Sequence, residues 1–106
     1  DGSYPKSEGK IKYRIINISG SQSELKVELR NNNSDQINYV ASKSFTDFIE
    51  YSASQIDDIY VSNYLNEIEY FRTKINLTAG VYLIVIKGNY PNKSKNIICN
   101  IIKLPE

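Results

Sequence analysis

The stretch Glu24–Arg30, with the sequence ELKVELR, indicates the fold class because it alternates strictly between charged and apolar side chains. In an extended chain, Leu25, Val27 and Leu29 lie on one face, and the charged residues lie on the other. Such a strand is typical of an antiparallel sheet that has one face against a hydrophobic core and the other in water.

The same two-residue period recurs along the chain and predicts further strands. It is found in Ile11–Ile15, Ile37–Ala41, Phe45–Tyr51, Phe71–Leu77 and Ile97–Ile101. Residues Val81–Ile86 form an unbroken apolar run, which is typical of a central strand that is covered on both faces.

Turn-forming residues separate these segments at intervals of about ten residues, as in a β-sandwich. They gather at residues 19–21, 31–35, 78–80 and 88–92. We therefore expect an all-β fold, an antiparallel eight-strand β-sandwich. The ambiguous part is Ser52–Tyr70, where Ile56, Ile59 and Tyr60 have helical spacing. We interpret it as a loop or a short strand, with a helical turn as the alternative.

Length and charge limit the class of protein. The chain has 106 residues, enough for one hydrophobic core. We expect residues 1–9 to be a flexible N-terminal segment and residues 10–106 to form the domain. The net charge is +1 and the basic residues are scattered, so the sequence does not predict a nucleic-acid partner.

The residue types that are missing exclude most enzyme designs. The chain has no His, no Met and no Trp, and it has a single Cys. The usual general base and the commonest transition-metal ligand are therefore absent. We expect no catalytic residue, and we interpret Cys99, which lies in an apolar strand, as a buried structural thiol.

Other side chains give weak signals for binding. Asp57 and Asp58 are weak candidates for calcium ligands, but no calcium-loop motif surrounds them, and we expect no cofactor. The tyrosines could form a platform for sugars or bases, although half-buried rings are the more common use of strand tyrosines. Sequons for N-glycosylation begin at Asn17, Asn32, Asn76 and Asn92.

The C-terminal half resembles a known family. It is similar to the C2-like domain (domain III) of the calpain cysteine proteases. The similar residues are 59–63, 69–85 and 97–101, and the most specific stretch is Leu77–Lys93. The resemblance covers about residues 10–104 and implies a C2-like or jelly-roll β-sandwich. Within it, Gly80, Tyr82 and Pro91 would be structural residues of a turn, a strand and a hairpin.

The resemblance also implies a function. The chain would be a non-catalytic regulatory module of a larger calpain-like thiol protease, a cytoplasmic hydrolase. It would dock to the catalytic domain of the same parent chain, and phospholipid or protein would be its further partners. Ser19–Glu24 offers one carboxylate where the family has an acidic loop, so calcium binding does not follow from the resemblance.

Two alternatives stay open. The Gly80–Tyr82 strand also resembles the pre-peptidase C-terminal domains, which are accessory β-sandwiches of secreted bacterial proteases. Under that interpretation the chain would be secreted. The other alternative is a small protease inhibitor with an immunoglobulin-like fold.

Overall fold

The computed structural model describes residues 4–19, 24–32, 34–65, 67–88 and 97–106. All regular structure in these ranges is strand, so the prediction of an all-β fold is confirmed. The same ranges contain no helix that could span a membrane. The strands are β1 (Ile11–Asn17), β2 (Leu25–Asn31), β3 (Ser34–Val40), β4 (Ser44–Phe45), β5 (Ile49–Glu50), β6 (Ile56–Asn63), β7 (Glu69–Leu77), β8 (Gly80–Lys87) and β9 (Ile98–Leu104).

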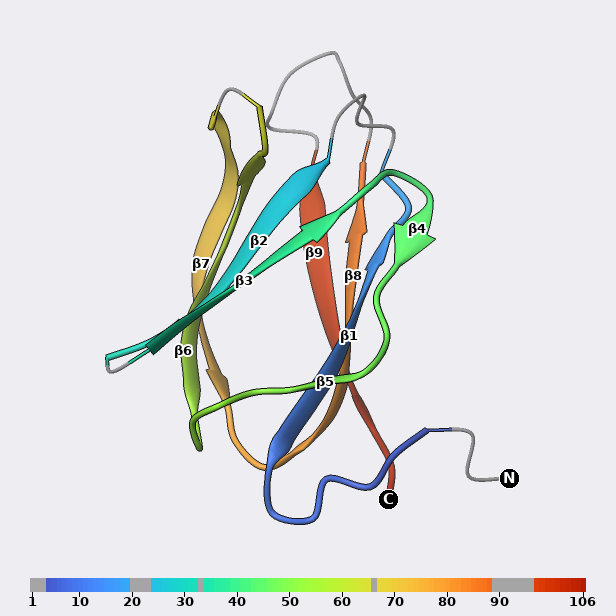
Figure 1. Ribbon diagram of the computed structural model, residues 1–106, viewed down its shortest axis with the longest axis vertical. Coiled ribbons are helices and arrows are strands. Elements are labelled where there is room, and N and C mark those ends of the chain that lie inside the picture. Colours follow the sequence, from blue (N-terminus) through green and yellow to red (C-terminus); the bar gives the residue numbers. More distant parts are fainter. Residues whose placement is uncertain (1–3, 20–23, 33, 66, 89–96) are drawn as a thin grey trace.

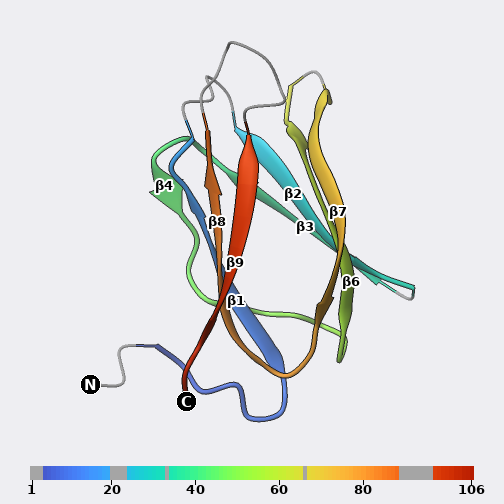
Figure 2. The same ribbon diagram turned by 180° about the vertical axis from the view of Figure 1, so that it is seen from behind.

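These strands form two sheets that face each other, as Figures 1 and 2 show from opposite sides. Sheet A has the order β4-β1-β8-β9, and β5 also pairs with β1. Sheet B has the order β3-β2-β6-β7. Buried side chains from both sheets form one hydrophobic cluster, so the arrangement is sandwich-like.

The pairing in sheet A differs from the purely antiparallel arrangement that the sequence predicts. Strands β1 and β8 are parallel, from the pair Ile11 and Gly80 to the pair Asn17 and Ile86. The reason is the path of the chain, because parallel neighbours need a long crossover. Along the chain, all of sheet B comes after β1 and before β8. This crossover returns the chain to the end of the molecule at which β1 starts.

The described residues form nine strands rather than eight, partly because the predicted strand Phe45–Tyr51 is split. Phe45 lies opposite Ile16, and Ile49 lies opposite Tyr13, so one extra residue is inserted between the two short strands. Thr46 occupies the insertion, where its Oγ1 accepts a hydrogen bond from the N–H of Ile15 at 3.1 Å.

The alternation predicted for β1 and β2 is confirmed by burial. The inward side chains of both strands are fully buried: Ile11, Tyr13, Ile15, Leu25, Val27 and Leu29. Burying a side chain of this size contributes about 1.5–3 kcal/mol. Strand β8 is central in sheet A, but only its inner face is fully covered, because Leu83 and Val85 are half-buried.

Strand β6 corrects the interpretation of Ser52–Tyr70 as a loop or a short strand with a helical turn as the alternative. Its eight residues lie between β2 and β7, in the interior of sheet B. The register with β7 shifts between Ile56 and Asp58, and the alternation of β6 breaks there. Ile56 and Ile59 are therefore both fully buried, which produces helix-like spacing within a strand.

Strand β3 points its apolar residues towards water and its polar residues towards the core, which is the reverse of the orientation that its alternation predicts. Ile37 and Tyr39 are 44% and 50% exposed, whereas Gln36 and Asn38 are half-buried. The side-chain amides of Gln36 and Asn38 donate hydrogen bonds to the hydroxyl of Tyr13, at 2.8 and 2.9 Å. Tyr13 is buried in the facing sheet, and a buried hydroxyl needs such partners. Burial also raises the pKa of Tyr13.

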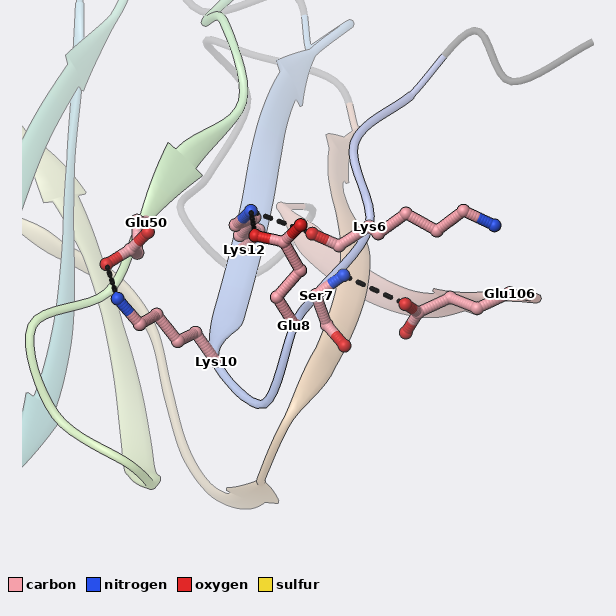
Figure 3. Close-up of polar contacts among 7 residues, drawn as sticks. All are labelled: Lys6, Ser7, Glu8, Lys10, Lys12, Glu50 and Glu106. Atoms are coloured by element: carbon pink, nitrogen blue, oxygen red, sulfur yellow. Dashed lines mark hydrogen bonds and ion pairs between the residues drawn. The ribbon is translucent and has the colours of Figure 1, made fainter.

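The segment before β1 contacts the other end of the chain. The backbone N–H of Ser7 donates to Oε1 of Glu106 at 2.8 Å, as drawn in Figure 3. The hydroxyl of Tyr4 donates to the carbonyl of Pro105. The first and the last described segments of the chain therefore lie at the same end of the molecule, which Figure 1 also shows.

Lys12 of β1 and Lys10, the residue just before this strand, make further polar contacts at this end of the molecule. The ammonium of Lys12 donates to the carbonyl of Lys6 at 2.7 Å and lies 3.8 Å from Glu8 (Figure 3). Lys10 forms an ion pair with Glu50 at 3.3 Å. Residues 1–3 lie outside the described residues, and the boundary between a segment 1–9 and a domain 10–106 stays a prediction.

The first prediction concerns the contact of Tyr13 across the core. Tyr13→Phe leaves two half-buried amides without their partner, so we expect the free energy of unfolding to fall by about 1–3 kcal/mol. Urea titration followed by circular dichroism measures it. Tyr39→Phe, which removes an exposed hydroxyl, is the matched control and should change little. Equal effects of the two substitutions would contradict the role assigned to Tyr13.

The second prediction concerns the pKa of Glu106. Hydrogen bonds from the backbone N–H and the hydroxyl of Ser7 lower the pKa of this carboxyl, because they favour its charged form. The stability that this contact contributes is thus present above the usual glutamate pKa of 4.5 and is lost as the pH falls through the lowered value.

Titration of the carboxyl carbons by NMR tests this contact. Ser7→Ala should raise the pKa of Glu106 part of the way towards its usual value, whereas Ser54→Ala, at an exposed serine, should leave it unchanged. An unchanged pKa in Ser7→Ala would show that the hydroxyl has no part in the contact.

Candidate binding surface

The outward side chains of sheet B form a surface of charged and aromatic groups, which we call the outer B face. It arises because residues that alternate with the buried ones point to the opposite side of the sheet. Neighbouring strands bring its members into register: Lys26, Glu28 and Arg30 of β2, Asp35, Ile37 and Tyr39 of β3, Asp58 and Tyr60 of β6, and Arg72 and Lys74 of β7.

Tyr60 lies between two arginines at the centre of this face. The guanidinium carbons of Arg30 and Arg72 lie 4.8 and 4.5 Å from the centroid of its ring. Arg72 is the direct cross-strand partner of Tyr60, and Arg30 is a diagonal neighbour on β2. Each such cation–π contact contributes about 0.5–1 kcal/mol at an exposed site.

Carboxylates fix both arginines. Arg30 forms an ion pair with Glu28 at 3.3 Å, and only 10% of the Glu28 side chain is exposed. Arg72 forms an ion pair with Glu69 at 3.5 Å. The Arg30 pair is largely buried, so Arg30 is held beside Tyr60 before any ligand arrives, which lowers the entropy that binding costs.

An exposed aromatic pair lies at one end of the same face. The rings of Tyr39 and Tyr64 meet edge to face, with centroids 4.9 Å apart, and these residues are 50% and 45% exposed. Ile37, Leu65 and Ile68, which lie close to them along the chain, are also exposed. A group of large exposed apolar side chains beside charged ones is typical of an interaction surface.

A smaller group of cation and rings lies on the outer side of sheet A. Arg14 of β1 lies 5.0 Å from the ring of Phe45 and 4.5 Å from the ring of Phe48. The ring of Tyr4 lies 6.4 Å from that of Phe48. Nε of Arg14 is buried without a hydrogen-bond partner. Two of its rings belong to the N-terminal segment and to the two-residue strand β4. Fewer paired strands therefore hold this group in place than hold the outer B face.

The two weak calcium candidates have neighbours that do not favour a cation. Oδ1 of Asp57 accepts a hydrogen bond from Gln55 at 2.8 Å. Asp58 lies directly opposite Arg30 on one side and Lys74 on the other. In the part of the chain that the structure describes, no three His, Cys, Asp or Glu residues group as they would around a metal ion. The expectation that no cofactor binds stays a prediction.

Gly80 and Tyr82 lie at the start of β8, where it joins β1. The N–H of Gly80 donates to the carbonyl of Lys10 at 2.9 Å, and its φ is +157°. A Cβ at this position would lie 2.9 Å from Cε of Lys103 and 3.2 Å from the ring of Tyr82, so a larger residue would be crowded. The hydroxyl of Tyr82 donates to the carbonyl of Thr78 at 2.9 Å. Pro91, the remaining structural candidate besides Cys99, lies outside the described residues.

Cys99 lies on β9 with its side chain packed against the hydrophobic cluster. Burial raises the pKa of its thiol to about 12. The thiol is therefore protonated at neutral pH and cannot act as a nucleophile there.

The sequon at Asn17 is closed in the folded chain. Asn17 and Ser19 are both fully buried. Nδ2 of Asn17 donates to the carbonyl of Val40 at 2.9 Å, and its Oδ1 accepts from Ser19. By contrast, Asn76 is exposed on β7. The sequons that begin at Asn32 and Asn92 include residues outside the described ranges.

The residues at the centre of the outer B face are not among the site residues that the sequence predicts. Arg30 and Arg72 belong to the polar sides of alternating strands, which usually face water without a further role. One feature of the sequence could have pointed to this site: opposite charges and an aromatic ring occur at the polar positions of three segments. These segments are Glu24–Arg30, Asp58–Tyr60 and Arg72–Lys74. Only the register of the strands brings these positions together.

Comparison with known proteins shows the fold alone. No family model and no curated protein matches the chain. The C-terminal domain of AlgF from P. aeruginosa has a TM-score of 0.60 at 15% identity, covering 92% of this chain and 100% of that one. An NMR structure of a protein from Eubacterium rectale has a TM-score of 0.55 at 14% identity, covering 93% and 94%. Neither structure is described as a calpain or C2-like domain.

The third prediction concerns the reactivity of Cys99. Because burial raises its pKa to about 12, the native thiol should react with Ellman's reagent at pH 8 far more slowly than the thiol of the chain unfolded in guanidinium. A cysteine placed at the exposed Ser54 in a Cys99→Ala background is the control and should react at once. Equal rates in the native and the unfolded chain would contradict the burial of Cys99.

Proposed function

We propose that this chain is a non-catalytic binding module that holds a protein partner against its outer B face. The observation that carries the proposal is the ordered group at its centre, where Tyr60 lies between Arg30 and Arg72, beside the exposed pair of Tyr39 and Tyr64. Tyrosine and arginine, together with tryptophan, are enriched among the residues that contribute most of the binding energy of protein interfaces.

The chemistry of the face favours a protein over a sugar polymer or a nucleic acid. Ile37 of this face is 44% exposed, and Leu65 and Ile68, which lie near Tyr64 in the chain, are 75% and 51% exposed; such aliphatic groups have little to offer to hydroxyls or phosphates. The charges also balance. The four cations of the face, Lys26, Arg30, Arg72 and Lys74, are matched by its three anions, Glu28, Asp35 and Asp58, together with Glu69, the ion-pair partner of Arg72. A face without net charge does not attract a phosphate backbone.

The nature of the parent protein is a separate proposal. A C2-like, jelly-roll module of a calpain-like cytoplasmic protease, docked to the catalytic domain of its own chain, rests on the resemblance of residues 10–104 alone. Its further partners, phospholipid or a second protein, rest on the same resemblance. The accessory domain of a secreted bacterial protease is the second candidate. It rests on the resemblance of the Gly80–Tyr82 strand alone.

Selection of peptide ligands followed by NMR mapping tests the binding proposal. A random peptide library is panned on the folded chain, and each selected peptide is titrated into the isotope-labelled chain. We expect shifts at Tyr39, Tyr60, Tyr64 and Arg72. A soluble polysaccharide and single-stranded DNA, added in separate titrations, should leave these signals unchanged.

Variants make the test quantitative. Tyr39→Ser and Arg72→Ser should each weaken the selected peptides by about tenfold or more, the size of an interface hot spot. Phe45→Ser removes a ring that is 62% exposed on the opposite sheet, and it should leave the affinity unchanged. Peptides that map to sheet A, or that bind Tyr39→Ser and Arg72→Ser as well as the original chain, would refute the proposal.

A further inference from the structure

Strand β9 is an edge of sheet A that carries little of the usual protection against pairing. Among the described residues it pairs with β8 alone. Ile98 and Ile102 are 46% and 47% exposed, and Lys103 is the one charged residue in the strand. Edge strands normally carry several charges, a proline or a bulge, since an unprotected edge is a template for another strand.

The two edge strands of sheet B, β7 and β3, are less suited to pairing with a copy of themselves. If β7 paired antiparallel about Thr73, Arg72 of one copy would lie opposite Lys74 of the other, and like charges that face each other are destabilising. In β3, the inward amides of Gln36 and Asn38 are held by Tyr13, and Asp35 carries a charge on the outward side.

We propose that β9 pairs antiparallel with β9 of a second copy of this chain, about a two-fold axis at Asn100. This register places Ile98 opposite Ile102 of the other copy, twice. It also places Cys99 opposite Ile101 and Asn100 opposite itself. The two sheets A then become one continuous sheet that runs through both molecules.

Three features of β9 select this register. Ile98 and Ile102 lie on the same outer side of the sheet, and the register makes these exposed side chains neighbours, so both lose contact with water. The amides of the two Asn100 residues meet on the axis and hydrogen-bond to each other. Lys103 lies opposite Ile97, so no like charges are directly opposed.

The outer side of β8 extends the apolar contact. Leu83 lies beside Ile102 and Val85 beside Asn100, and both β8 residues are only half-buried. The contact nevertheless consists of one short strand from each copy. Interfaces of this size belong to the weak class, and we expect a dissociation constant of roughly 10–100 μM.

Sedimentation equilibrium of the 106-residue chain tests the proposal. The expected result is a reversible equilibrium between monomer and dimer. Ile102→Lys sets an ammonium group against Ile98 twice in each dimer, and it should raise the dissociation constant by more than about tenfold. Ile37→Lys introduces the same charge at an exposed isoleucine of β3, and it should leave the dissociation constant unchanged.

Cross-linking tests the axis. In a Cys99→Ala background, Asn100→Cys should give a disulfide-linked dimer when oxidised glutathione is added, because the two residues at a two-fold axis are direct partners. Thr73→Cys in the same background, on the edge strand β7, should stay monomeric.

Three outcomes would overturn the proposal. They are a chain that stays monomeric up to about 1 mM, a dimer that Ile102→Lys does not weaken, and the failure of Asn100→Cys to cross-link. The test is independent of the proposed binding function, since Ile102→Lys lies on the sheet opposite the outer B face and should leave peptide binding unchanged.

Discussion

The hydroxyl of Tyr13 is the constraint on which much of this molecule depends. It is buried in sheet A and must find hydrogen-bond partners across the core, in sheet B. Gln36 and Asn38 meet this need, so β3 turns its amides inwards. The alternation of a strand then sends Ile37 and Tyr39 outwards, where Tyr39 meets Tyr64. One polar atom in the core thus determines which side chains β3 contributes to the outer B face.

The sequence predicts those parts of the fold where apolar pattern and burial agree. The alternation of Glu24–Arg30 and of Ile11–Ile15 corresponds to real strands with the expected inward faces. It fails at β3, because pattern alone reports where apolar residues are and not which polar atom in the facing sheet needs a partner. At β6 it fails because the register shift between Ile56 and Asp58 breaks the period on which the interpretation rests.

The candidate surface is harder to predict than the fold. Arg30, Tyr60 and Arg72 lie on three different strands, and they meet only because β6 lies between β2 and β7 in one particular register. That register is set by the buried residues on the other side of the sheet, such as Val27 opposite Val61. The absence of His from the chain, by contrast, is visible at once, and it limits the acid–base chemistry available to the chain. Similarity of fold to the AlgF domain adds no chemistry, since unrelated functions share folds of this kind.

The contacts of Ser7 with Glu106 and of Tyr4 with Pro105 have a topological consequence. Because residues near both chain ends touch, the domain can be inserted into a surface loop of another protein, entering and leaving at nearly one point. For the same reason, a short linker between the ends would allow a circular permutation with new termini in an exposed turn. Insertion of the whole domain would keep the parallel pairing of β1 with β8, because it leaves uncut the crossover that sheet B provides.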